Sequence, residues 1–464
     1  MNNTMLIRFN VKNFLSFNKK KDGSAEEFSM ISGKVRSKKE HTFSNGKIKL
    51  LKFAAVYGAN AAGKSNLVKA IHFMHRAIVS GIPNGYTEKY CKIDPENKDR
   101  SSYFEVEIEL DDKYYAYGFE ILLNQSRYTS EWLIELHDDN TEKIIFARDI
   151  DKGEYEFGTE LRNNEVYKKL SVYADDIKED SSILFLSLMN QNKKNLYQDY
   201  QAATIIRNIY IWFKDKLDIS YPNQPISDYT YLSETDNVDE VCKLISAFGT
   251  GIENFKMIEV PVESVLSKLP KELQKNLLER LERGLIEIRE NTNLASVNIA
   301  MRSNTDFFIL TANAEQNISC RTIVFGHGQE NVQYKLGEES DGTVRLLDLL
   351  EILIAGEGKT YVIDELDRCL HPSMTYKFVE TFLKMAAEKN IQLIVTTHES
   401  RLMDFDLLRR DEIWFVNKRE SGESVIYSLE EYNARFDQKI DKAYLEGRYG
   451  GVPIFSTVFP VKEE

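Results

Sequence analysis

Residues 58–65, Gly-Ala-Asn-Ala-Ala-Gly-Lys-Ser, have the pattern Gly-x-x-x-x-Gly-Lys-Ser of a phosphate-binding loop. Glycines at both ends of the loop let backbone N–H groups turn toward phosphate oxygens. The Lys64 ammonium can reach the outer phosphates of a nucleoside triphosphate, and the Ser65 hydroxyl can ligate Mg²⁺. We therefore expect a nucleotide site that includes Gly58, Asn60, Gly63, Lys64, Ser65 and Asn66.

The loop has the flanking elements that this chemistry needs. Phe53–Tyr57 is a short apolar run typical of a buried strand. After the loop, apolar residues recur at helical spacing: Leu67, Ala70, Ile71, Met74 and Ile78. A helix that begins at the loop directs the positive end of its dipole at a bound anion. The context favours a nucleotide site over a chance glycine-rich turn.

Two carboxylates end a second apolar run. Residues 361–363 are Tyr-Val-Ile, and Asp364 and Glu365 follow them. In parallel α/β sheets, ligands bind at the carboxyl ends of the strands, so both acids are expected to face the phosphates. Asp364 can hold Mg²⁺ directly or through water, and Glu365 can accept a proton from an attacking water or orient it. The alternative is a strand that ends in a solvated acidic turn.

Two further segments gain weight from their positions. Residues 394–397 form an apolar run that leads into His398, which could bond the terminal phosphate, although a lone histidine is usually structural. Ser340, Gly342 and Thr343 precede a helical pattern and could offer hydroxyl and N–H groups to an anion. Taken alone, they would be an ordinary helix cap. Their place between the loop and the two carboxylates favours the functional reading.

The succession of these four motifs resembles the heads of ABC-type ATPases. More narrowly, it resembles the SMC/RecF-like branch, whose prokaryotic members include the overcoming-lysogenisation-defect (OLD) proteins and the RloA-like ATPases. The narrower resemblance is carried by residues 339–343, residues 364–372 and the tail at residues 444–450. It implies an α/β fold: a P-loop NTPase head of the ABC type, with an antiparallel β subdomain and a helical insertion.

The resemblance also implies a composite site for ATP and Mg²⁺. Two heads dimerise head to tail, and residues 340–343 of one copy close over the nucleotide held by Lys64 and Ser65 of the other. Leu370-His371 occupies the position of the loop that communicates across this interface. Gln191 is similar in placement to the glutamine that reaches Mg²⁺ and the attacking water, but it could equally cap the following helix. The implied catalytic residues are Glu365, His398 and Gln191, and the implied metal ligands are Ser65, Asp364 and Gln191.

Three departures from the family pattern limit what carries over. Leu15 stands where repair-type relatives often carry arginine, so an N-terminal phosphate or base contact is in doubt. His371 replaces the aspartate usual in transporters. The helical insertion is also much shorter than an SMC arm, which weakens any role in bridging distant DNA.

The apolar patterns divide the chain into three parts. Residues 1–192 are expected to hold the loop and the antiparallel β subdomain, since residues 104–110 and 115–121 alternate as a hairpin does. Residues 193–292 are expected to be a helical insertion, with residues 270–290 as a short exposed arm rather than a long coiled coil. Residues 293–464 complete the head, because helices and apolar strands alternate there as in a parallel sheet.

Composition indicates a cytoplasmic protein with no membrane partner. The chain has 464 residues, enough for two or three folding units, and no apolar run approaches the length of a bilayer span. The start lacks the layout of a secretory signal, and the four cysteines are scattered. The net charge of −13 speaks against a surface devoted to DNA, although an acidic chain can still carry a basic groove.

The resemblance implies an ATPase that senses or regulates a separately encoded effector in anti-phage defence. In the RloA-like and related groups the neighbouring gene often supplies a nuclease or a toxin. ATP binding between two heads would change their mutual affinity and hydrolysis would reset it, so an effector held by one state is released in the other. The expected partners are a second copy of the chain, in a homodimer or higher homo-oligomer, and the effector.

Three other functions are alternatives for a chain with these motifs. A RecF- or SMC-like ATPase in DNA repair or maintenance would bind nucleic acid in a basic groove, and salt-dependent DNA binding would identify it. A nuclease like the OLD proteins is disfavoured because the stretch after His398 is too short for a separate metal-dependent domain. A transporter subunit is disfavoured because the segment at residues 339–343 is degenerate and the helical insertion is out of place there.

Overall fold

The computed structural model describes residues 4–44, 47–137, 141–222, 230–233, 238–267, 269–290, 296–303, 305–313, 315, 317–328, 332–354, 358–432 and 440–450. Contacts group the chain into two compact units. The first comprises Met1–Ser220, Gly356–Leu366 and Phe382–Glu464, and the second comprises Tyr221–Ala355 and Asp367–Thr381. The three-part division expected from the sequence remains a prediction.

A six-stranded, mostly parallel sheet forms the centre of the first unit. Its order is β11 (Leu217–Ser220), β17 (Thr360–Ile363), β18 (Gln392–Thr396), β5 (Phe53–Tyr57), β19 (Ile413–Lys418) and β20 (Ser424–Ser428). Only the β19–β20 pair is antiparallel. Every residue of β5, β17 and β18 is buried, as expected for parallel strands covered on both faces. The predicted parallel sheet is confirmed, and with it the α/β class of the fold.

An antiparallel sheet of seven strands completes the β structure of this unit. Its order is β10 (Glu154–Phe157), β9 (Glu142–Asp149), β8 (Arg127–Leu136), β7 (Lys113–Leu122), β6 (Ser102–Leu110), β1 (Thr4–Lys12) and β2 (Glu26–Ser29). The predicted hairpin is the β6–β7 pair, and the antiparallel subdomain is confirmed. The strands β3 (Thr42–Ser44) and β4 (Lys49–Leu51) form a separate two-stranded sheet, and Leu50 of β4 packs against Met5 and Ile7 of β1.

The first residues of the chain differ from the sequence expectation. The alternating residues 6–11 predict an edge strand, but this strand, β1, lies between β6 and β2 and pairs with both. The apolar residues among 13–17 suggest a second strand, but these residues form a tight turn in which Phe14 and Phe17 make a single bridge. Asn13 and Leu15 have φ values of 56° and 53°, and this left-handed backbone cannot continue a strand.

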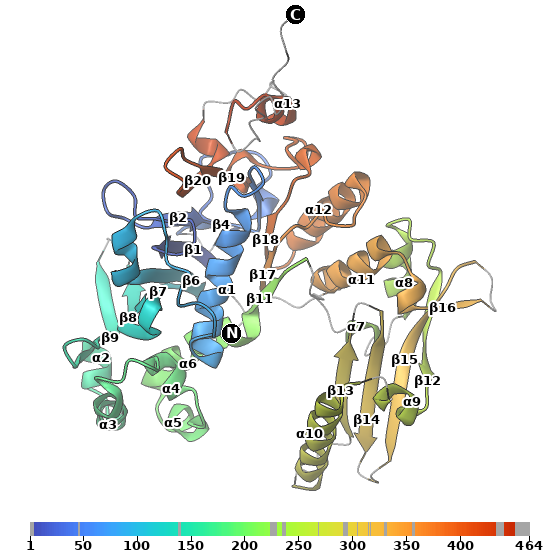
Figure 1. The fold of residues 1–464 in the computed structure, drawn as a ribbon, viewed down its shortest axis with the longest axis horizontal. Coiled ribbons are helices and arrows are strands. Elements are labelled where there is room, and N and C mark those ends of the chain that lie inside the picture. Colours follow the sequence, from blue (N-terminus) through green and yellow to red (C-terminus); the bar gives the residue numbers. More distant parts are fainter. Residues whose placement is uncertain are drawn as a thin grey trace, which may run out of the picture. The chain divides into compact units, whose positions relative to one another are not determined.

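Helix α1 (Lys64–Ser80) follows the loop directly and buries Leu67, Ala70, Ile71, Met74 and Ile78, the residues that predicted it. Five short helices follow β10 along the chain: α2 (Thr159–Arg162), α3 (Tyr167–Ile177), α4 (Phe185–Met189), α5 (Lys194–Asp199) and α6 (Thr204–Ile211). Helix α4 contacts α1, whereas α2 contacts β9 (Figure 1). A π-helical turn, Trp212–Lys216, leads from α6 into β11. The short helix α13 (Ile440–Leu445) is the last helix in the described part of the unit.

The second unit is built on an antiparallel sheet of five strands. The main path runs β12 (Asn254–Glu259), β15 (Ile318–Gly326), β14 (Phe307–Asn313) and β13 (Ser296–Arg302), and β16 (Gln333–Lys335) pairs with β15. Its described helices are α7 (Thr230–Ser233), α8 (Val238–Ser246), α9 (Val262–Leu266), α10 (Lys271–Glu290) and α11 (Asp341–Ile354). Helix α12 (Pro372–Ala386) begins in this unit and ends in the first.

The expectation of an exposed arm at residues 270–290 is wrong. These residues form α10, but Leu277 and Leu281 are buried in a cluster with Leu310 and Ala312 of β14. The opposite side of the helix stays in water, with Ile286 52% exposed. The reason is amphipathicity: the apolar stripe of α10 covers one face of the sheet of its own unit.

Within the part of the chain that the structure describes, no helix combines the length and the apolar character needed to cross a bilayer.

Candidate functional site

The phosphate-binding loop lies between the end of β5 and the start of α1. Both glycines of the loop lie so close to neighbouring atoms that a side chain would collide with them. A Cβ on Gly58 would lie 2.4 Å from the carbonyl oxygen of Val416, and a Cβ on Gly63 would lie 2.3 Å from Ser424 Oγ. Gly63 also has a φ of 119°, a backbone conformation that residues with side chains rarely adopt. Asn60 is exposed at the tip of the loop.

The Lys64 side chain is directed into this loop. Its ammonium donates to the carbonyl oxygens of Gly58 at 2.8 Å and Ala59 at 3.3 Å, and the residue is only 6% exposed. The amine is therefore held within the curve of the loop, where the pattern predicts the outer phosphates.

Three hydroxyl and carboxyl groups meet beside the loop. Ser65 Oγ donates to Asp364 Oδ1 at 3.1 Å, and Thr396 Oγ1 donates to the same oxygen at 2.6 Å. Ser65 is the second residue of α1, whereas Asp364 directly follows β17 and Thr396 ends β18. A hydroxyl paired with a buried carboxylate is the kind of hard oxygen set that Mg²⁺ prefers. The donors present fit this metal.

Glu365 is half-buried and has a strained backbone. Its φ is 51°, in the left-handed region, and its N–H donates to Thr396 Oγ1 at 2.8 Å. Such strain persists only where the surroundings hold it, and it concentrates at functional sites. Thr396 thus links the two acids, since it donates to one side chain and accepts from the next backbone N–H. The sequence analysis did not assign it a role, although a threonine at the carboxyl end of a predicted strand was a usable signal.

His398 leaves the same edge of the sheet. The strand order places β18 between β17 and β5, so the chain after β18 emerges between the two carboxylates and the loop. Thr397 N donates to Val56 O at 3.2 Å, which ties this segment to the strand before the loop. The His398 side chain is exposed. The structure therefore brings Lys64, Ser65, Asp364, Glu365 and His398 to one edge of one sheet.

A second layer of polar residues supports the loop. Ser424 Oγ lies 2.5 Å from Ala62 O and 2.7 Å from Ser16 Oγ, and Asn66 Nδ2 donates to Ser16 Oγ at 2.7 Å. Asn66, expected to bind nucleotide, is in this structure a contact of Ser16. The sequence analysis had considered the segment around Leu15 only for a missing arginine, and so missed the serine beside it.

The structure contradicts the expected placement of Gln191. This residue follows α4, whose Ser187 hydroxyl donates to Ile78 O at 2.6 Å. Ile78 lies near the C-terminal end of α1, about 21 Å along the helix from Lys64 at 1.5 Å per residue. Gln191 is exposed, and the chain does not return to the sheet until β11. It therefore lies far from the expected metal ligands Ser65 and Asp364.

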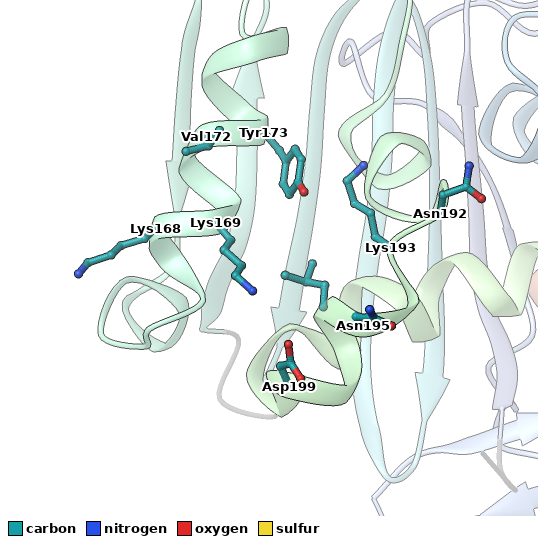
Figure 2. A pocket seen from close by; sticks show the side chains of 9 residues that line it. Lys168, Lys169, Val172, Tyr173, Asn192, Lys193, Asn195 and Asp199 are labelled. Carbon is teal, nitrogen blue, oxygen red and sulfur yellow. The ribbon is translucent and has the colours of Figure 1, made fainter.

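The surroundings of Gln191 support this correction. Asn192 and Lys193 border an open cavity of about 730 Å³. Figure 2 shows them across from Tyr173 of α3, among the short helices, and Lys193 Nζ lies 4.4 Å from the centroid of the Tyr173 ring.

The chain rejoins the sheet at β11, the outer strand beside β17. The sequence did not predict this strand. Its last residue, Ser220, accepts a hydrogen bond from Asp364 N at 2.9 Å. The first glutamine after this strand, Gln224, lies outside the described residues.

The segment with Ser340, Gly342 and Thr343 belongs to the second unit and begins α11. Ser340 Oγ accepts from Thr343 N at 3.1 Å and lies 2.9 Å from Thr343 Oγ1, which is the capping geometry considered as the plain alternative. A Cβ on Gly342 would lie 2.8 Å from Cys369 O, so the segment closely approaches the residues just before His371. Ser340 is exposed. Its role toward nucleotide stays a prediction.

Comparisons with solved structures give weak overall similarity to SMC heads. An SMC head bound to the C-terminal winged-helix domain of ScpA shows 16% identity over 92% of this chain and 99% of that chain, with a TM-score of 0.40. The SMC head domain from Thermotoga maritima shows 13% identity over 91% and 98%, with a TM-score of 0.35. A head with an extended coiled coil from Pyrococcus furiosus shows 16% identity over 96% and 100%, with a TM-score of 0.33.

Superposition scores this low carry no argument about function, and no curated protein matches the chain. One protein-family model, in contrast, matches residues 53–404, which is more than half of the chain. The matched range begins at β5 and includes the phosphate-binding loop, both carboxylates and His398. The chain therefore belongs to the family with the description "AAA domain, putative AbiEii toxin, Type IV TA system".

Proposed function

We propose that this protein binds ATP with Mg²⁺ and hydrolyses it. The observation that carries the proposal is the meeting of Lys64, Ser65 and Asp364 at one sheet edge, with Ser65 Oγ 3.1 Å from Asp364 Oδ1. These two residues would hold the Mg²⁺, which when bound neutralises charge on the phosphates. Residues 299 positions apart in the sequence form this contact, so the fold itself assembles the site.

The roles of the remaining residues follow from their positions. Lys64 would hold the outer phosphates, because its ammonium lies inside the loop. Glu365 would accept the proton of the attacking water, since its carboxylate follows directly after Asp364 on a fixed, strained backbone. His398 would donate a hydrogen bond to the terminal phosphate from the neighbouring strand end. Thr396 would orient Asp364 through its 2.6 Å hydrogen bond.

Removal of the metal tests this proposal. Phosphate release from ATP by the full chain is expected to require Mg²⁺ and to fall to background when EDTA exceeds the metal. Restoring excess Mg²⁺ should recover the rate, which controls for loss of the fold. Hydrolysis that continues at an undiminished rate in EDTA would contradict the proposed roles of Ser65 and Asp364.

Gln191 provides a test of the corrected site. The substitution Gln191→Ala is expected to leave the rate of ATP hydrolysis within about twofold, because the side chain is exposed beyond α4 and away from the loop. Steady-state phosphate release at saturating MgATP measures it. A loss of two orders of magnitude would show that Gln191 reaches the nucleotide in the working protein.

We also propose that two copies of the chain complete each nucleotide site. Ser340 is exposed at the start of α11, where N–H groups and a helix dipole favour an anion. In the proposed dimer, Ser340 and Gly342 of one copy close over the nucleotide held by Lys64 of the other. ATP would then join the heads, and hydrolysis would separate them.

The biological role that we propose is control of a separately encoded effector, a nuclease or toxin, in anti-phage defence, as in the OLD- and RloA-like ATPases. The family description, which refers to a toxin–antitoxin system, supports this direction. Co-purification with the products of adjacent genes, in ATP and in ADP, tests the role. A partner retained in only one nucleotide state is the expected result, and no partner in either state would contradict it.

The basic pair at residues 409 and 410 gives the alternative of a DNA-binding ATPase little support, because Arg409 is buried. Arg409 is 2% exposed, and its guanidinium pairs with Asp411 at 2.6 Å and donates to Ser37 O at 3.0 Å. Two adjacent arginines usually form a solvated surface run, but Arg409 does not. This arginine ties the N-terminal segment to the turn before β19 and offers no charge to a phosphate backbone.

A further inference from the structure

The C-terminal tail at residues 444–450, which no role described so far uses, packs against the strand that carries the phosphate-binding loop. Ile440, Ala443 and Tyr444 of α13 are 2%, 2% and 7% exposed. The turn after the helix is closed by hydrogen bonds from Gly447 N to Tyr444 O at 2.8 Å and from Arg448 N to Ala443 O at 3.0 Å. A short helix with this much buried surface is firmly docked.

The Tyr444 ring lies between two aromatic residues of the central sheet. Its centroid is 5.9 Å from that of Tyr57, edge to face, and 5.7 Å from that of Phe415, with the rings stacked at 24°. Tyr57 is the last residue of β5 and directly precedes Gly58. Aromatic pairs in these arrangements add stability beyond the area they bury.

The same packing reaches the segment that follows His398. The Tyr57 hydroxyl donates to Glu399 O at 3.3 Å. Helix α13 also contacts the 3-10 turn Ser400–Leu402. The C-terminal segment therefore contacts both the residue before the loop and the chain just beyond His398.

The Tyr444 ring packs on Tyr57, directly before the loop, and its hydroxyl interacts with the first loop residue, Gly58. Burial raises the pKa of this hydroxyl, and a hydrogen bond from the Gly58 backbone N–H opposes the rise in pKa. The carbonyl oxygen of Gly58 also has a partner: it accepts a hydrogen bond from Lys64 Nζ at 2.8 Å. The first residue of the loop is thus fixed between the tail and the lysine that the loop presents.

We propose that Tyr444 is a positioning residue for the phosphate-binding loop, an inference that rests on the proposed nucleotide-binding function. Its hydroxyl holds the first peptide group of the loop in the conformation that receives phosphate. The loop then loses less conformational entropy when nucleotide binds. Because coupling between two equilibria is reciprocal, bound nucleotide in turn stabilises the docking of α13. The tail then reports the nucleotide state at the surface of the head.

Tyr449 offers a matched control. Its ring also stacks on Phe415, at 6.0 Å and 20°, and it is 5% exposed. Its hydroxyl, however, has no hydrogen-bond partner among the described residues. The substitution Tyr449→Phe therefore removes the same atom from the same aromatic cluster without touching the loop.

The experiment is a titration of the full chain with fluorescent ADP in Mg²⁺. Tyr444→Phe keeps the ring and is expected to raise Kd about fivefold, the size of one neutral hydrogen bond, and Tyr449→Phe is expected to stay within about twofold of the unsubstituted protein. In hydrolysis assays the Tyr444 variant should raise KM more than it lowers kcat, as lost ground-state binding does. Equal Kd values for the two variants would overturn the positioning role.

A second measurement does not depend on substitutions. Amide hydrogen exchange at residues 440–450 of the unsubstituted protein is expected to slow when MgADP is added, because the loop and the tail stabilise each other. Unchanged exchange in the nucleotide-bound protein would overturn the inference and leave the proposed function intact. If the unsubstituted protein binds no nucleotide, the proposed function fails, and the inference fails with it.

Discussion

Lys64→Ala is expected to abolish nucleotide binding. The Lys64 ammonium is buried within the loop, and hydrogen bonds from a charged donor contribute about 1.5–3 kcal/mol each. Two such bonds to phosphate oxygens correspond to a rise in Kd of at least about 100-fold. The variant would keep the backbone N–H groups of the loop as phosphate ligands. It would lack the Lys64 ammonium, which the loop encloses.

The measurement is a titration with a fluorescent ATP analogue in Mg²⁺. Lys69→Ala is the matched control, because Lys69 is exposed on the same helix and its loss changes the net charge by the same amount. Melting temperatures of both variants without nucleotide separate loss of binding from loss of fold. If Lys64→Ala binds as tightly as Lys69→Ala, the loop is not the phosphate site.

Glu365→Gln is expected to stop hydrolysis while ATP still binds. Glutamine has nearly the same size and keeps the backbone N–H that donates to Thr396 Oγ1 at 2.8 Å, so the local geometry should persist. It cannot accept the proton of the attacking water, and general-base catalysis contributes about 10²–10⁴-fold. We expect kcat to fall at least about 100-fold, and the ATP-bound dimer to accumulate because its decay step is blocked.

Two readouts check this prediction: steady-state phosphate release, and molar mass by light scattering with and without ATP. Glu399→Gln is the control, since this carboxylate follows His398 and caps the turn through a bond from Arg401 N that glutamine can keep. Hydrolysis by Glu365→Gln at the rate of the control would refute the role of Glu365 as base. A variant that binds ATP without hydrolysing it, yet stays monomeric, would refute the composite site.

The sequence predicted the parts of the site that depend on local pattern. Glycine spacing, apolar runs and the acids that end them are properties of short segments. They located the loop, the helix α1 that begins at Lys64 and the strands that lead to Asp364 and His398. Because all these strands are buried and parallel, their carboxyl ends had to meet at one edge.

Other features depended on which segments pack together. Gln191 has the residue type that the site needs, but a stack of short helices holds it at the far end of α1. The apolar stripe of α10 was visible in the sequence, whereas the sheet that it covers was not. Supporting residues such as Thr396, Ser16 and Ser424 carry no distinctive spacing, so the hydrogen bonds that reveal them exist only in the fold.

The sequence by itself thus determined that a loop of the phosphate-binding pattern, a candidate metal ligand and a candidate base belong to one parallel sheet, because backbone geometry and burial impose those patterns on neighbouring residues. Only the tertiary structure decided which glutamine is excluded, which hydroxyls fix the acids, and that Tyr444 contacts Gly58 from near the other end of the chain. Contacts of that kind join residues hundreds of positions apart. Their formation depends on how whole elements pack, and no local periodicity encodes it.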